Sequence, residues 1–109
     1  MSEIPRINER VPSLMPDGHW IDNHDSEVWI KDGKYHRTDG PAAITMMGSK
    51  SWFKNGKRHR NDGPAIVFAN GGGIRWYLNG DYYYHFEHWL EANDEISDSK
   101  KLFLKLKYG

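Results

Sequence analysis

The chain contains an internal repeat, and this repeat constrains the fold more than any other feature. Residues 29–44 read WIKDGKYHRTDGPAAI and residues 52–67 read WFKNGKRHRNDGPAIV. A shortened third copy, WYLNGDYYYHF, begins at Trp76 and keeps only the tryptophan and the Asn-Gly pair. The three copies start 23 and 24 residues apart, at Trp29, Trp52 and Trp76. A period of this length indicates one small supersecondary unit that stacks on its neighbours.

Turn-forming residues punctuate each copy at matching places. Asp-Gly at 32–33 and Asn-Gly at 55–56 and 79–80 are typical of two-residue hairpin turns, because both positions accept positive φ. Asp-Gly-Pro follows in the two full copies, at 39–41 and 62–64. The pattern predicts a strand, a turn, a strand and a loop per copy, with the copies side by side in an antiparallel meander. The 15 aromatic residues and 11 glycines favour the same β structure.

Cross-strand partners follow from this arrangement. The repeat places Trp29, Trp52 and Trp76 in one row across the sheet, with Ile30, Phe53 and Tyr77 in the next. We interpret the tryptophan row as sheet core in preference to a platform that stacks on a ligand, since aromatic neighbours commonly stabilise sheets.

The C-terminal segment has a different periodicity. Phe86, Trp89 and Leu90 lie at positions i, i+3 and i+4, which predicts a helix over residues 85–93 that covers the sheet.

A second helix is favoured over residues 100–107, with Ser97 or Ser99 as its N-cap. The alternation of Leu102, Leu104 and Leu106 with less apolar residues leaves a strand as the alternative.

The expected architecture is thus mainly β. It is an antiparallel β-meander of ~23-residue hairpin repeats with a short α-helical C-terminal cap. A chain of 109 residues is sized for one domain. Its expected parts are an N-terminal extension or degenerate repeat (1–28), the hairpin repeats (29–84) and the helical cap (85–109).

Composition excludes several classes of function. The 15 basic and 15 acidic residues give a net charge of zero, which argues against a duplex nucleic-acid binder or a polybasic membrane binder. The absence of cysteine excludes a disulfide framework, a thiolate zinc site and a cysteine nucleophile. The sequence shows no secretory signal and no apolar run of membrane-spanning length. We expect a cytoplasmic protein.

The unit W-x-x-[DN]-G-K-x-H-R-x-D-G-P-A resembles the repeat of many small proteins of bacteriophages and other viruses. The period, the tryptophan before Asn-Gly and the later glycine turn are more distantly similar to the MORN repeat, a hairpin unit that stacks into an elongated antiparallel sheet. The resemblance covers about residues 29–80. The chain departs from MORN repeats at Arg37 and Arg60, where those repeats have glycine.

This resemblance implies more about fold than about activity. MORN modules are generally regarded as scaffolds for protein or lipid interaction. Small phage proteins without catalytic residues often bind and inhibit a host protein, including components of host antiviral defence. The resemblance therefore implies a viral inhibitor that acts in the cytoplasm of the infected cell, an expectation based on analogy.

His-Arg-x-Asp is the sharpest candidate for a site, at residues 36–39 and again at 59–62. In a binding interpretation, each arginine clamps a phosphate or carboxylate and each histidine adds a donor. In a structural interpretation, the aspartates only shape the turns by accepting hydrogen bonds from nearby groups. Repetition favours the structural interpretation, because turn chemistry must recur in each unit.

Charge is unevenly distributed along the chain. Residues 31–60 contain eight Lys or Arg against two acids, whereas residues 81–98 contain six acids and no Lys or Arg. This dipole suits docking onto a complementary protein surface, and it suits an anionic small molecule less well. Solvated faces that merely keep the sheet soluble are an equally good explanation.

Support for catalysis or metal binding is weak. The sequence has no nucleophile elbow and no phosphate-binding glycine loop. His85 and His88, with Glu87 and Glu91, lack a third strong ligand nearby for zinc. We therefore expect no enzyme activity, no cofactor and no metal.

The sequence predicts a non-enzymatic binding module, and its expected partner is a host protein. The alternative is a sponge that sequesters an anionic signalling nucleotide in the His-Arg loops. A homodimer also stays open, since an exposed edge strand near Trp29 would pair easily. The candidate contact residues are His36, Arg37, Asp39, Lys57, Arg58, His59, Arg60 and Asp62, with Trp52 and Tyr77 if the open sheet face takes part.

Overall fold

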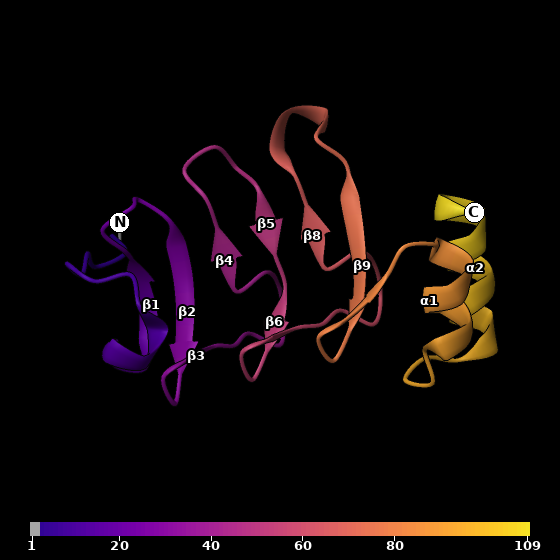
Figure 1. The fold of residues 1–109 in the computed structure, drawn as a ribbon, viewed down its shortest axis with the longest axis horizontal. Coiled ribbons are helices and arrows are strands. Elements are labelled where there is room, and N and C mark those ends of the chain that lie inside the picture. Colours follow the sequence, from indigo (N-terminus) through magenta and orange to yellow (C-terminus); the bar gives the residue numbers. More distant parts are fainter. Residues whose placement is uncertain (1–2) are drawn as a thin grey trace.

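A computed structural model describes residues 3–109 as a large antiparallel sheet of sequential hairpins followed by two helices (Figure 1). The main sheet has the order β1-β2-β4-β5-β8-β9-β10, β3 pairs with β2, and β6 pairs with β7. The protein is mixed but strand-rich, so the mainly β prediction holds only in this coarser form. The strands are β1 (Gly18–Ile21), β2 (Glu27–Lys31), β3 (Lys34–Tyr35), β4 (Ala43–Ile44), β5 (Lys50–Ser51), β6 (Phe53–Lys54), β7 (Lys57–Arg58), β8 (Ile66–Val67), β9 (Ile74–Leu78) and β10 (Asp81–Tyr83).

The Asx-Gly pairs make the predicted hairpin turns. Asp32, Asn55 and Asn79 have φ angles of 51°, 51° and 49°, and the glycine that follows each also has positive φ. Asx residues and glycine tolerate this left-handed conformation, so the β2–β3, β6–β7 and β9–β10 connections need only two residues.

The sheet begins upstream of the first full repeat. β1 pairs with β2, so Trp29 lies inside the sheet and the expected exposed edge near it is wrong. The edge at β1 is itself lined by the N-terminal segment, because Ile7 N donates to Ile21 O and Ile21 N donates to Pro5 O. Met15, on the segment after the 3₁₀ turn η1 (Pro12–Leu14), packs on Val28 of β2 in a small core.

The main core lies at the other end, beneath the helices α1 (Phe86–Ala92) and α2 (Asp98–Tyr108). Both predicted helices are present. Ser97 caps α2 by accepting a hydrogen bond at 3.1 Å from Lys100 N. This cap and the burial of Leu104 settle the choice between helix and strand for residues 100–107.

Only one of the three repeat tryptophans belongs to this core. Trp76 is buried against Phe86 and Trp89 of α1. Trp29 and Trp52 are half-buried, and an arginine lies over each ring, so the core prediction fails for these two. The reason is that the helices reach only the last repeat, while the earlier rings face the Asp-Gly-Pro loops.

Candidate functional site: the cleft between the Asp-Gly-Pro loops

Each arginine of the His-Arg-x-Asp motif closes its own loop. Arg60 donates from Nε to Asp62 Oδ1 (2.9 Å) and from Nη1 to Pro64 O (3.0 Å), and its guanidinium lies 4.0 Å from the centre of the Trp52 ring. The first loop repeats this arrangement: Arg37 bonds to Asp39 Oδ1 (2.8 Å) and Pro41 O (3.1 Å) over the Trp29 ring. Charge-assisted bonds of this kind fix both the loop and the arginine.

Glycine in each loop leaves room for the guanidinium. A Cβ at Gly63 would lie 2.7 Å from Arg60 Cζ, and one at Gly40 would lie 2.8 Å from Arg37 Cζ. Any side chain at these positions would displace the arginine. The Arg-x-Asp-Gly-Pro sequence is therefore one structural unit in which each residue depends on the others.

Each histidine of the motif joins one repeat to the next. His36 Nδ1 accepts a hydrogen bond from Asn55 N at 3.0 Å, and His59 Nδ1 accepts one from Asn79 N at 2.9 Å. These amides belong to the left-handed turns of the following repeat, where the hairpin itself gives them no partner.

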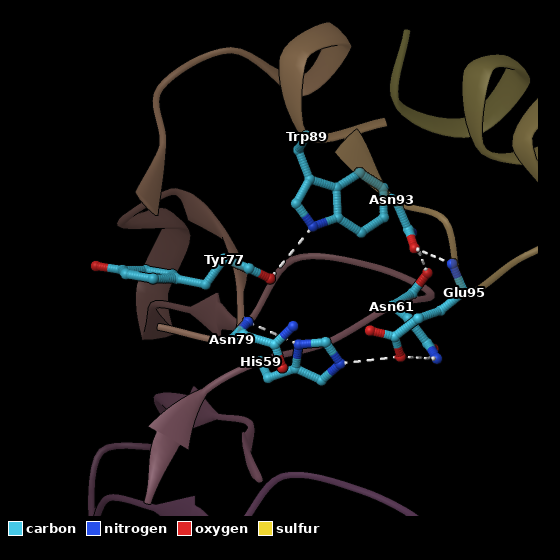
Figure 2. Close-up of polar contacts among 7 residues, drawn as sticks. All are labelled: His59, Asn61, Tyr77, Asn79, Trp89, Asn93 and Glu95. Carbon is cyan, nitrogen blue, oxygen red and sulfur yellow. Dashed lines mark hydrogen bonds and ion pairs between the residues drawn. The ribbon is translucent and has the colours of Figure 1, made fainter. Parts of the chain in front are cut away.

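No third Asp-Gly-Pro loop follows the second full repeat. Instead, the chain after α1 forms hydrogen bonds with His59 and Asn61 of that repeat (Figure 2). Because His59 Nδ1 accepts a bond, we assign its ring proton to Nε2, which donates to Glu95 Oε1 at 3.2 Å. Asn61 Nδ2 donates to the same oxygen at 3.2 Å, and Asn93 Nδ2 donates to Asn61 O at 2.8 Å. Trp89 Nε1 donates to Tyr77 O at 3.3 Å.

Between the two loops lies a cleft of about 550 Å³. Arg37, Arg60 and Lys54 contribute positive charge, and Asp39, Asp62 and Glu95 contribute negative charge. The charges therefore balance. The remaining lining residues are Thr38, Gly40, Pro41, Trp52, His59 and Asn61.

The pKa values of two of these carboxyl groups are lowered. The hydrogen bond and positive charge of Arg37 lower the pKa of Asp39. Burial by itself raises the pKa of Glu95, but hydrogen bonds from Asn61 and His59 and the charge of Lys54 outweigh it, so the net direction is down. Both groups are therefore negatively charged at neutral pH.

The structure brings six of the ten candidate residues to this cleft. They are Arg37, Asp39, Trp52, His59, Arg60 and Asp62. The other four lie outside its lining. His36 is half-buried between repeats, and Lys57 is exposed on β7.

The last two candidates lie together on another part of the sheet. The Arg58 guanidinium lies 5.3 Å from the centre of the Phe53 ring and 5.8 Å from that of Tyr77. Tyr77 also packs on Tyr82 at 5.3 Å between ring centres.

Six lining residues were not among the candidates, namely Thr38, Gly40, Pro41, Lys54, Asn61 and Glu95. Thr38 and Asn61 are the variable positions inside His-Arg-x-Asp, so their place in the motif was a usable signal. Glu95 had no such signal, because it is 36 residues from His59 and reaches it only through the packing of α1.

Residues 3–109 contain no group of three His, Cys, Asp or Glu side chains placed to hold a metal ion. His85 and His88 form an edge-on ring contact, with 5.2 Å between ring centres. No helix within the same range is long and apolar enough to cross a membrane.

Comparison with known proteins gives no family model, curated protein or solved structure that matches the chain. The resemblance to phage and MORN-type repeats accordingly stays a prediction from sequence.

Proposed function

We propose that the protein is a non-enzymatic binding module built of MORN-like hairpin repeats, and that it docks onto a partner protein through the cleft between its two Asp-Gly-Pro loops. The observation that carries the proposal is the internal bonding of the cleft's charged groups. Because each arginine is held by its own loop, the cleft walls are ordered before a partner arrives, which lowers the entropic cost of binding.

The chemistry of the cleft favours a protein over a small anion. Asp39 and Asp62 lie on its rim with side chains 82% and 54% exposed, and they would repel a phosphate. Two donor atoms of each arginine are already in use. A half-buried tryptophan beside paired charges is instead typical of a protein interface, where tryptophan and arginine carry much of the binding energy.

The resemblance to phage repeats makes a host protein the expected partner. Inhibition of that protein, for example of a component of antiviral defence, would follow if docking blocked its own interaction surface. This step rests on the resemblance alone.

The proposal is tested by affinity capture from host lysate with variants on the cleft rim. Thr38→Trp would fill the cleft, and Lys54→Glu would reverse one of its charges. Both residues are exposed, and neither side chain bonds to another described residue in the loops. Lys31→Glu is the matched control, because Lys31 occupies the same repeat position as Lys54 and lies outside the cleft.

We expect both cleft variants to lose the captured protein and Lys31→Glu to retain it. Equal capture by all three variants would contradict docking at the cleft. A nucleotide released from the purified protein on heating, without a captured protein, would support the sponge and overturn the proposal.

A further inference from the structure

The helical end of the molecule has a second groove, which the proposed function does not use. It has a volume of about 640 Å³ and lies between α1 and α2, with Phe86 and Leu90 as its apolar lining. The pair of helices stands at the end of the sheet opposite the N-terminal hairpin (Figure 1). The groove shares no lining residue with the Asp-Gly-Pro cleft, although Glu95 of the cleft lies on the chain between the two helices.

Helix α2 also carries large exposed apolar side chains outside the groove lining. Leu102, Phe103 and Leu106 are 60%, 54% and 81% exposed, while Leu104 on the same helix is buried. A surface helix normally carries one apolar stripe, and α2 carries a buried one and an exposed one. Three such side chains on one short helix form a patch of the kind that a partner covers.

The groove walls carry opposite charges at equal spacing. Glu87 and Glu91 line it from α1, and Lys101 and Lys105 line it from α2. Residues four apart share one face of a helix, so each pair forms a row. No ion pair within residues 3–109 involves any of these four side chains. The charges of both rows are thus available to another molecule.

We propose that a second copy of this chain covers the groove, in a dimer that also covers Leu102 and Leu106 of each copy. A two-fold interface brings one patch against itself, so it requires a surface that is complementary to itself. The groove meets this requirement, because a two-fold axis sets the acidic row of one copy against the basic row of the other. An anionic membrane fits less well, since Glu87 and Glu91 line the groove and would be repelled.

Sedimentation velocity over a wide range of protein concentration tests the proposal. The wild-type chain should show a reversible monomer–dimer equilibrium. Leu106→Glu should raise the dimer dissociation constant by more than about tenfold, because it buries a charge at the interface. Leu14→Glu is the matched control, since Leu14 is 67% exposed on η1 and lies outside the groove. It should dimerise like wild type.

Variants that reverse the charge of one row at a time distinguish this interface from other modes of dimerisation. One variant carries Glu87→Lys with Glu91→Lys, and another carries Lys101→Glu with Lys105→Glu. Each alone should stay monomeric, whereas an equimolar mixture should form a heterodimer. Circular dichroism of each variant checks its fold.

Three results would overturn the proposal. The first is a wild-type chain that stays monomeric at every concentration. The second is a dimer that Leu106→Glu and the charge variants leave unchanged. The third is a monomeric wild-type chain that binds vesicles of phosphatidylserine and phosphatidylcholine, together with a Leu106→Glu variant that does not bind them. This result would assign the patch to a membrane. None of these results bears on the Asp-Gly-Pro cleft, so the proposed function can stand or fall separately.

Discussion

His36 and Asn55 are joined by a 3.0 Å hydrogen bond, in which the backbone amide of Asn55 donates to the imidazole Nδ1 of His36. The same bond recurs one repeat later, from Asn79 to His59. At the start of the sheet Asp17 Oδ1 accepts from Asp32 N at 2.7 Å. Each hairpin turn is thus tied to the layer before it by one side-chain acceptor, which gives the histidines a structural role.

We expect His36→Ala to lower the free energy of unfolding by about 1–2 kcal/mol, because it leaves the Asn55 amide without its protein partner. His88→Ala, at an exposed position on α1, should change stability little. Chemical denaturation of the two variants checks this. Equal stability of His36→Ala and wild type would show that the bond contributes nothing.

Arg60→Ala should lower the free energy of unfolding by about 2 kcal/mol, through loss of a charge-assisted bond and of the contact with Trp52. Arg60→Lys should recover little, because an ammonium group cannot hold Asp62 and Pro64 O in the same planar geometry. Thermal unfolding measures both, with exposed Lys50→Ala as control. A fully stable Arg60→Ala that loses only ligand binding would favour the sponge.

Gly63→Ala tests the packing of the same loop without removing a charge. The new Cβ would push the guanidinium off Asp62, so this variant should lose stability by an amount similar to that of Arg60→Ala. The double variant with Gly63→Ala and Arg60→Ala should lose much less stability than the sum of the losses in the two single variants. Additive losses would mean that the glycine and the arginine act independently.

Trp89 should be the most sensitive position in the cap, since it is fully buried against Trp76. We expect Trp89→Ala to cost about 3–5 kcal/mol, enough to unfold a marginal domain. Trp89→Phe should cost less, because it keeps an apolar ring and loses the bond to Tyr77 O. Urea titrations followed by circular dichroism rank the variants. Equal losses in the two variants would contradict a contribution of the buried ring beyond the indole N–H bond.

The lowered pKa of Glu95 makes the cap sensitive to acid. A carboxyl group whose pKa is lower in the folded state stabilises that state above its unfolded pKa, about 4.3, and loses the effect as pH falls through the folded value. Wild type should therefore lose more stability than Glu95→Gln between neutral pH and acid. Parallel pH profiles of the two proteins would exclude the effect.

Much of the fold was predictable because its signals are local. The Asx-Gly turns require only two residues with positive φ, and the spacing of Phe86, Trp89 and Leu90 suffices to predict α1. For residues 1–28 the sequence left an extension and a degenerate repeat as alternatives, since β1 diverges too far from the repeat to be assigned from its pattern.

The exposure of the tryptophans depends on what covers each one, which no local pattern specifies. An arginine covers Trp29 and Trp52, while α1 covers Trp76 because the third copy lacks the Arg-x-Asp-Gly-Pro segment. That missing segment was the one signal that something else must pack there. Only the repeated residues of the cleft could be predicted from the sequence. Glu95 could not, because tertiary packing brings it to His59.

Site-specific photocrosslinking tests the central claim, docking of a partner protein at the cleft, most directly. A photoreactive amino acid replaces Thr38 on the cleft rim in one protein and Lys31 outside the cleft in another. After irradiation in host lysate, we predict one covalent adduct with a host protein from position 38 and none from position 31. The same adduct from both positions, or no adduct from position 38, would contradict the proposed docking.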